Sequence, residues 1–139
     1  MNSESVRYRV NDYELACLVA GRGVPLVLVH GSLCDYRYWQ GQFAALSGRY
    51  HVVAPSLRHY FPEQWDGNGT GFTTEQHMSD LLALLDQLPG PVHLLGHSRG
   101  GNLCLRVALA APEKLRSLTL ADPGGDFAED VFRMVDLVS

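Results

Sequence analysis

The stretch LLGHSRGGNL, Leu94–Leu103, decides the fold of this chain. It follows an aliphatic segment (92–96) that predicts a short buried strand, and it opens a segment (98–111) with the pattern of a helix. A serine in so sharp a strand-to-helix turn needs small neighbours two positions before and after it, and the start of the helix then faces any oxyanion that forms there. We therefore predict a nucleophile elbow with Ser98 at its apex. Its other members are Gly96, His97, Arg99 and Gly100.

The rest of the chain alternates between strand and helix patterns. Further strands are expected at residues 5–10, 13–20, 24–29, 51–55 and 117–122, and further helices at 37–47, from 73 to the proline at 89, and at 126–139. The turn signal at residues 11–12 joins the first two strands into a hairpin. This order predicts an α/β fold, with a mostly parallel sheet flanked by helices. The polar, glycine-rich loop at 56–71 is expected to form a functional rim.

Composition narrows the classes of function. A chain of 139 residues fits one domain, and its net charge of −4 offers no reason to expect nucleic acid or a membrane surface as a partner. Three widely spaced cysteines argue against a disulfide scaffold and favour a reducing, cytoplasmic setting. The N-terminus shows no signal peptide, and no cluster of ligands with suitable spacing predicts a metal or a cofactor.

A second motif follows the aliphatic run at 24–29, namely His30, Gly31, Ser32 and Leu33. With the elbow, it makes the chain resemble the α/β-hydrolase superfamily. The resemblance implies an oxyanion hole formed by the backbone N–H of Ser32 or Leu33 and that of Arg99, while His30 is expected to hold the loop. It also implies an incomplete fold, with about six of the usual eight strands. Residues 1–125 would form the core and residues 126–139 the start of a cap or linker helix. Many relatives carry the motif D-x-R-G-x-G after the strand that corresponds to 51–55. Residues 56–60 of this chain, Ser-Leu-Arg-His-Tyr, differ from that motif.

The catalytic histidine is the missing component. All six histidines lie at or before position 97, whereas this superfamily orders its triad as Ser, then acid, then His. Asp122 is a candidate acid or else a turn residue, and further carboxylates follow at Asp126, Glu129, Asp130 and Asp136. His59, on the rim loop, is the best placed of the upstream histidines, but we do not expect any of them to replace the missing base. Removing the histidine from another serine hydrolase costs about 2 × 10⁶ in rate, so we expect this chain alone to bind acyl groups better than it turns them over.

Three functional hypotheses remain open. The first is acyl-transfer hydrolysis of a small-molecule ester, thioester, amide, lactone or related C–C bond by Ser98; aspartate at this position would instead match the dehalogenase and epoxide-hydrolase pattern. The second is a non-catalytic protein that keeps the ligand pocket. The third is a fragment that needs a complementary chain. An exposed edge of the incomplete sheet also predicts self-association or pairing with a C-terminal fragment.

Overall fold

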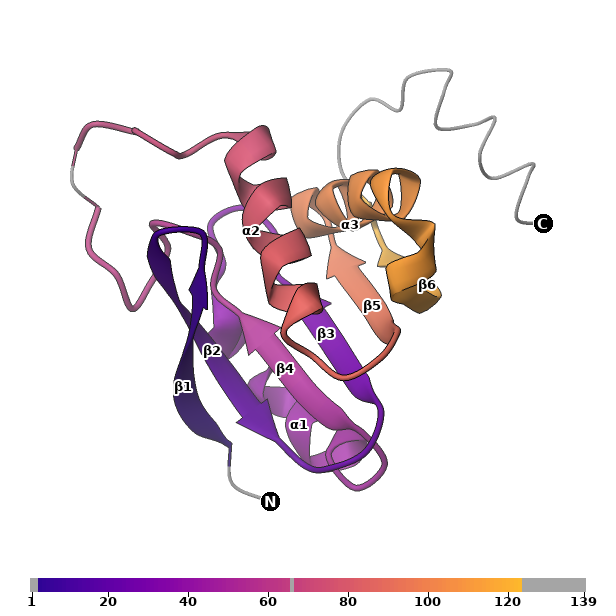
Figure 1. Ribbon diagram of the computed structural model, residues 1–139. Helices are drawn as coiled ribbons and strands as arrows, with labels where there is room; N and C mark the ends of the chain where they lie inside the picture. Colours follow the sequence, from indigo (N-terminus) through magenta and orange to yellow (C-terminus); the bar gives the residue numbers. More distant parts are fainter. Residues whose placement is uncertain (1–2, 66, 124–139) are drawn as a thin grey trace.

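The computed structural model describes residues 3–65 and 67–123 (Figure 1). Its strands are β1 (Glu4–Val10), β2 (Tyr13–Ala20), β3 (Pro25–Val29), β4 (His51–Pro55), β5 (Val92–His97) and β6 (Leu115–Ala121). Its helices are η1 (Tyr36–Trp39), α1 (Gln40–Leu46), α2 (Thr74–Asp86), α3 (Arg99–Ala110) and η2 (Pro112–Lys114). The predicted boundary at residue 125 and the helix expected at 126–139 lie outside the described residues.

The six strands form one sheet in the order β1-β2-β4-β3-β5-β6. The pairings of β3 with β4, β3 with β5 and β5 with β6 are parallel, whereas the hairpin partner β2 pairs antiparallel with both β1 and β4. The predicted α/β class and the mostly parallel sheet are therefore confirmed. All five residues of β3 are buried, as expected for the central strand of a sheet covered on both faces.

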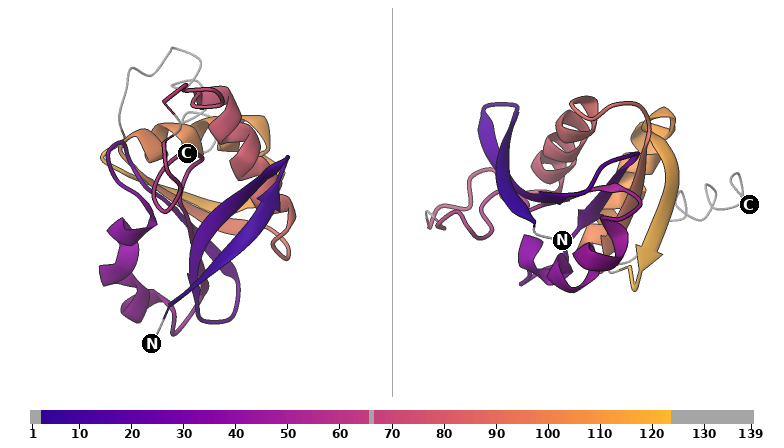
Figure 2. Two further views of the ribbon diagram at one scale, coloured as in Figure 1. Left: turned by 90° about the vertical axis from the view of Figure 1, so that its left-hand side faces the viewer. Right: turned by 90° about the horizontal axis from the view of Figure 1, so that it is seen from below.

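Two apolar clusters lie on opposite faces of the sheet and give the fold three layers (Figure 2). On one face, α2 and α3 pack through leucines, Cys104 and Val107 against alternate residues of β2 to β5. On the other face, Trp39 and Phe43, from η1 and α1, pack against the remaining alternate residues, such as Leu28 and Val52. None of the helices within the described ranges is long and apolar enough to cross a membrane.

Several predicted boundaries need small corrections. The helix after the elbow begins at Arg99 rather than Ser98, because Ser98 has a non-helical backbone and is the N-cap residue. The sixth strand begins at Leu115, two residues earlier than the predicted 117.

The parallel strands β3, β4 and β5 all run in the same direction, so their carboxyl ends lie at the same end of the sheet (Figure 1). The HG loop, the long segment 56–73 and the elbow follow these three strands in turn. Loops at the carboxyl ends of parallel strands are the usual place for ligand sites in open α/β sheets. The fold thus brings the three sequence features together at the carboxyl-terminal end of the sheet, and we call these three loops the rim.

Candidate active site

Ser98 has an unusual backbone conformation, with φ of 55° and ψ of −122°. Such a conformation costs about 1–3 kcal/mol and persists only where the surrounding structure imposes it. The N–H of Ser98 donates to the carbonyl oxygen of Ala121 (3.0 Å), and its carbonyl oxygen accepts from the N–H of Asn102 (3.2 Å). Within the described part of the chain, the Ser98 hydroxyl makes no hydrogen bond. The turn therefore holds a serine with a strained backbone and a hydroxyl that is not tied to another described group.

Two glycines of the turn are required by close approach of the backbone. A Cβ atom on Gly100 would lie 2.4 Å from the carbonyl oxygens of both Val29 and His30, and one on Gly96 would lie 2.4 Å from that of Gly100. These are backbone atoms of packed elements, so they cannot move aside as a flexible side chain would. The spacing Gly-x-Ser-x-Gly is therefore a packing requirement of this turn.

The HG loop touches the turn directly. A Cβ atom on Gly31 would lie 3.0 Å from the Cβ of Ser98, so the two segments meet at the serine side chain. Ser32 and Leu33 follow as exposed turn residues, and Leu33 has a positive φ of 59°. Among the described residues, no acceptor is bonded to the backbone N–H of Ser32, Leu33 or Arg99. The loop and the start of α3 thus each contain backbone N–H groups that make no hydrogen bond within the described structure.

His30 is fully buried beneath this loop. The N–H of Leu57 donates to its Nε2 (3.0 Å), so Nδ1 carries the proton and donates to the carbonyl oxygen of Gly31 (2.8 Å). Burial lowers the pKa of His30 to about 4. With both nitrogens bonded and the ring packed against Tyr60 at 4.7 Å, His30 links the loops after β3 and β4 and has no nitrogen left for proton transfer.

Asp122 directly follows β6, next to Ala121, whose carbonyl oxygen accepts from Ser98. The aspartate is exposed and has a positive φ of 44°. Within residues 3–65 and 67–123, it forms no hydrogen bond or ion pair. Because β5 and β6 are parallel, Asp122 lies at the same carboxyl-terminal end of the sheet as the elbow, and its carboxylate is available to a partner.

The remaining rim histidines are held by other contacts. His97 stacks on Tyr38 with ring centroids 4.8 Å apart, and its buried Nδ1 has no partner among the described residues. His59, the substitute base weighed from the sequence, bonds through Nε2 to the carbonyl oxygen of Thr70 (2.6 Å) and packs edge-on against Trp65. No described histidine is hydrogen-bonded to Ser98.

Behind the turn, a series of hydrogen bonds joins buried polar side chains, and no sequence motif predicts it. Arg99 donates from Nη2 to Nδ1 of the buried His77 (3.0 Å), and Nε2 of His77 donates to the carbonyl oxygen of Arg58 (3.2 Å). The Arg58 guanidinium in turn forms two bonds of 2.9 Å with the carboxylate of Asp80, which is 1% exposed. These contacts tie α3 to α2 and to the loop after β4. The helical spacing of His77 and Asp80 with buried leucines was the only available signal.

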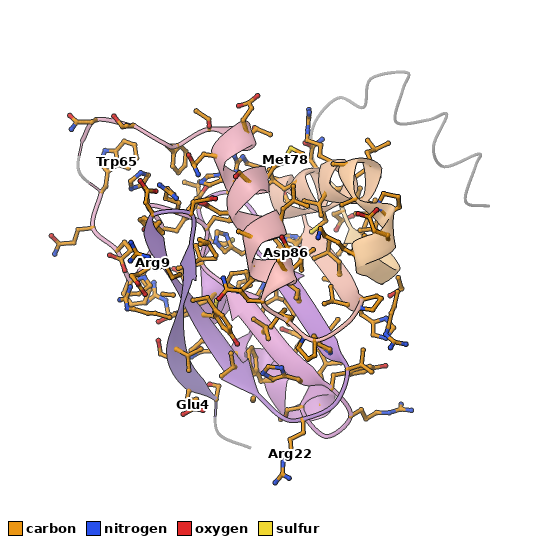
Figure 3. All side chains as sticks on the ribbon, in the orientation of Figure 1. Glu4, Arg9, Arg22, Trp65, Met78 and Asp86 are labelled. Atoms are coloured by element: carbon orange, nitrogen blue, oxygen red, sulfur yellow. The ribbon has the colours of Figure 1, made fainter. Side chains whose placement is uncertain are left out.

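The rim is also apolar. The large hydrophobic side chains that are exposed in the described structure all belong to rim segments: Leu33, Tyr38, Phe61, Trp65 and Phe72. Figure 3 shows Trp65 on the long loop between β4 and α2. In the same described ranges, no group of three or more His, Cys, Asp or Glu side chains is placed to hold a metal ion.

Comparison with known proteins identifies the family. Residues 26–138 match the family model described as the alpha/beta hydrolase family. The chain belongs to this family, as its fold and motifs imply.

Individual relatives are longer than this chain. It is 32% identical over 134 residues to the uncharacterized protein Rv2715 of Mycobacterium tuberculosis, which covers 92% of this chain and 38% of the relative. It is 31% identical over 100 residues to a pimeloyl-(acyl-carrier protein) methyl ester esterase of Nitrosomonas europaea. This match covers 72% of this chain and 37% of the esterase. The crystal structure of the epoxide hydrolase VrEH1 from Vigna radiata matches with a TM-score of 0.79 and 28% identity, over 85% of this chain and 39% of that one. The chain therefore spans about two fifths of the length of these relatives.

Proposed function

We propose that this chain carries the nucleophile and the oxyanion side of a serine hydrolase site. Its substrate would be a small acyl compound, namely an ester, thioester, amide or lactone, or the acyl side of a related C–C bond. The observation that carries the proposal is the strained Ser98, with a free hydroxyl, between two segments with unbonded backbone N–H groups. Similarity to a methyl ester esterase supports acyl chemistry, and serine rather than aspartate at the turn favours it over the epoxide-hydrolase pattern.

In this mechanism a base takes the Ser98 hydroxyl proton while the oxygen attacks the acyl carbonyl carbon and forms a tetrahedral oxyanion. Its collapse breaks the bond to the leaving alcohol, thiol, amine or carbon, which receives that proton, and leaves an acyl-serine for water to hydrolyse. The negative charge that develops on the carbonyl oxygen is met by the N–H of Arg99 and by that of Ser32 or Leu33. A donor of this kind is worth about 2.7–4 kcal/mol of transition-state stabilisation. The apolar rim would hold the acyl chain, and Asp122 would orient the base.

No histidine follows Ser98 in the 139 residues, and the buried His30 and His77 each have both ring nitrogens engaged. We therefore place the base in a part of the protein beyond Ser139, either in the same polypeptide or in a complementary one. On its own, the chain would acylate slowly and turn over poorly. The same observation favours a second candidate function, a non-catalytic protein that binds acyl compounds at this rim.

A fluorophosphonate probe separates the two functions, because it reacts quickly only with an activated serine. Because the chain lacks the base, we expect covalent labelling of the purified chain at Ser98 to be slow and to become faster when imidazole is added as an external base. Intact mass and peptide mapping detect the labelled serine. Ser98→Ala should abolish labelling, and Ser5→Ala, which changes an exposed serine of β1, should leave it unchanged. With imidazole present, labelling no faster than that of Ser98→Ala would reject the nucleophile role and leave the binding function.

A further inference from the structure

The loop between β3 and η1 carries the backbone N–H groups of Ser32 and Leu33, which we call the loop donors, in an exposed turn. Leu33 is fully exposed and has a positive φ of 59°. The N–H of Cys34 donates to the carbonyl oxygen of Gly31 (3.3 Å) and closes the turn around the loop donors. Neither loop donor is hydrogen-bonded within the described structure. Their position is therefore set by the contacts at the two ends of the loop.

Both ends of this loop contact His97. At the first end, a Cβ atom on Gly31 would lie 3.3 Å from Nδ1 of His97 and 3.0 Å from the Cβ of Ser98. At the second end, the ring of Tyr38 stacks on the imidazole of His97, with centroids 4.8 Å apart and planes inclined by 16°. Tyr38 also packs edge-on against the buried ring of Trp39, at 4.9 Å. The loop is thus closed over one imidazole ring.

The stack joins η1 to the residue that precedes the nucleophile. His97 is the last residue of β5, and Ser98 follows it by one peptide bond. The N–H of Tyr36 donates to Oγ of Ser56 (3.0 Å), which ties the same element to the loop after β4. Stacked rings resist sliding and tilting, because either movement reduces the area in contact and the attraction between the two ring systems. The stack on His97 therefore restrains the distance from the loop donors to the nucleophile.

The core does not depend on the side chain of Tyr38. This side chain is 46% exposed, and its hydroxyl makes no hydrogen bond within residues 3–65 and 67–123. Substitution of a side chain of this kind changes the stability of a protein little. A change at Tyr38 can therefore alter the site while the rest of the fold stays intact.

We propose that Tyr38 is a positioning residue for the oxyanion hole. By stacking on His97, it holds the loop donors at the distance from Ser98 that the oxyanion requires. The inference rests on the proposed function of Ser98 and deepens it, because it identifies a residue that acts on the reaction without touching the reacting atoms. A misplacement of about 1 Å costs roughly 100-fold in rate, so loss of the stack should be measurable even if the loop moves by less.

The test measures the rate of fluorophosphonate labelling, with imidazole present, for a probe with an ethyl chain and one with a decyl chain. Tyr38→Leu removes the stacked ring and should slow labelling about 10- to 100-fold with both probes. Tyr38→Phe keeps the ring and should restore most of the rate. The matched control is Tyr50→Leu, which removes a tyrosine packed edge-on against His93 (5.5 Å), near the start of β5, and should leave the labelling rate unchanged. Circular dichroism checks that each variant is folded.

Labelling of Tyr38→Leu at the parent rate would overturn the inference, and so would equal slowing in Tyr38→Phe, because the ring would then not be the cause. Slowing with the decyl probe alone would also overturn it, since Tyr38 would then contact the alkyl chain. If Tyr38→Leu does not fold, His97→Asn removes the other ring of the stack and should slow labelling to the same extent. A parent that labels no faster than Ser98→Ala would reject the nucleophile and this inference together, whereas a labelling parent with an unaffected Tyr38→Leu would reject the inference alone.

Discussion

Replacing Gly100 by alanine tests whether the elbow is held by backbone contact. The added Cβ would lie 2.4 Å from the carbonyl oxygens of Val29 and His30, about 1 Å short of ordinary contact. Neither oxygen belongs to a flexible side chain, so α3 must move away from β3. Overpacking of this kind costs about 1–3 kcal/mol, and two backbone contacts place Gly100→Ala at the upper end, about 3 kcal/mol. For a chain of this size that corresponds to a fall in Tm of roughly 10 °C.

The same substitution should impair the site, because it separates Ser98 from the loop that begins at Gly31. A misplacement of about 1 Å can cost roughly 100-fold in rate, so fluorophosphonate labelling should slow by about that factor. Urea unfolding followed by circular dichroism measures the stability. The matched control is Gly41→Ala, in α1, where a Cβ meets nothing within 4 Å and alanine should stabilise the helix by about 0.5–1 kcal/mol. If Gly100→Ala unfolds at the same urea concentration as the parent and labels equally fast, the packing argument is wrong.

Further predictions concern buried charges and the sheet edge. Asp80→Asn removes the buried counter-ion of Arg58 and leaves it, among the described residues, only the exposed Asp12, at 3.8 Å, so it should cost about 3 kcal/mol in urea unfolding; a loss below about 1 kcal/mol would contradict a buried ion pair. His30 has a folded pKa of about 4 against 6.5 when unfolded, so the unfolded state binds more protons between these values. His77, whose folded pKa burial also lowers to about 4, contributes in the same window. Stability should therefore be full above pH 6.5 and fall as the pH is lowered toward 4; His30→Gln should remove about half of this dependence, and an equally steep profile in that variant would exclude His30 as a source. The edge strand β6 should promote self-association, seen by sedimentation and reduced by Thr119→Lys, whereas a monodisperse parent monomer would refute it.

Local patterns accounted for most of the architecture. The hairpin at Asn11, the buried strands and the helix after Ser98 were all predicted, because each depends on residues close together in the chain: a turn pair, an aliphatic run or a periodic apolar face. Boundaries moved by one or two residues where caps decided them. At Ser98 the strained φ and ψ angles prevented helical geometry, which the sequence pattern alone does not reveal.

The polar chain behind the elbow could not be predicted in the same way. Arg58 with Asp80, and His77 with Arg99, are each separated by 22 residues, and nothing in the local sequence selects these partners among the other charged residues. His77 is buried and bonded through both nitrogens, which its place in a helix pattern does not reveal. Such pairing depends on which faces of α2 and α3 meet above the sheet.

The sequence by itself determined the class of fold and the position of the reactive turn, because the spacing of glycines around Ser98 and the aliphatic runs are local steric and hydrophobic requirements. Only the tertiary structure decided what surrounds that serine. The strand order places β3 between β4 and β5, which brings Gly31 against Ser98 and buries His30 between two loops. It also leaves the Arg99 guanidinium with a neutral partner. Charge compensation is a property of three-dimensional neighbours, and the linear pattern of residues does not contain it.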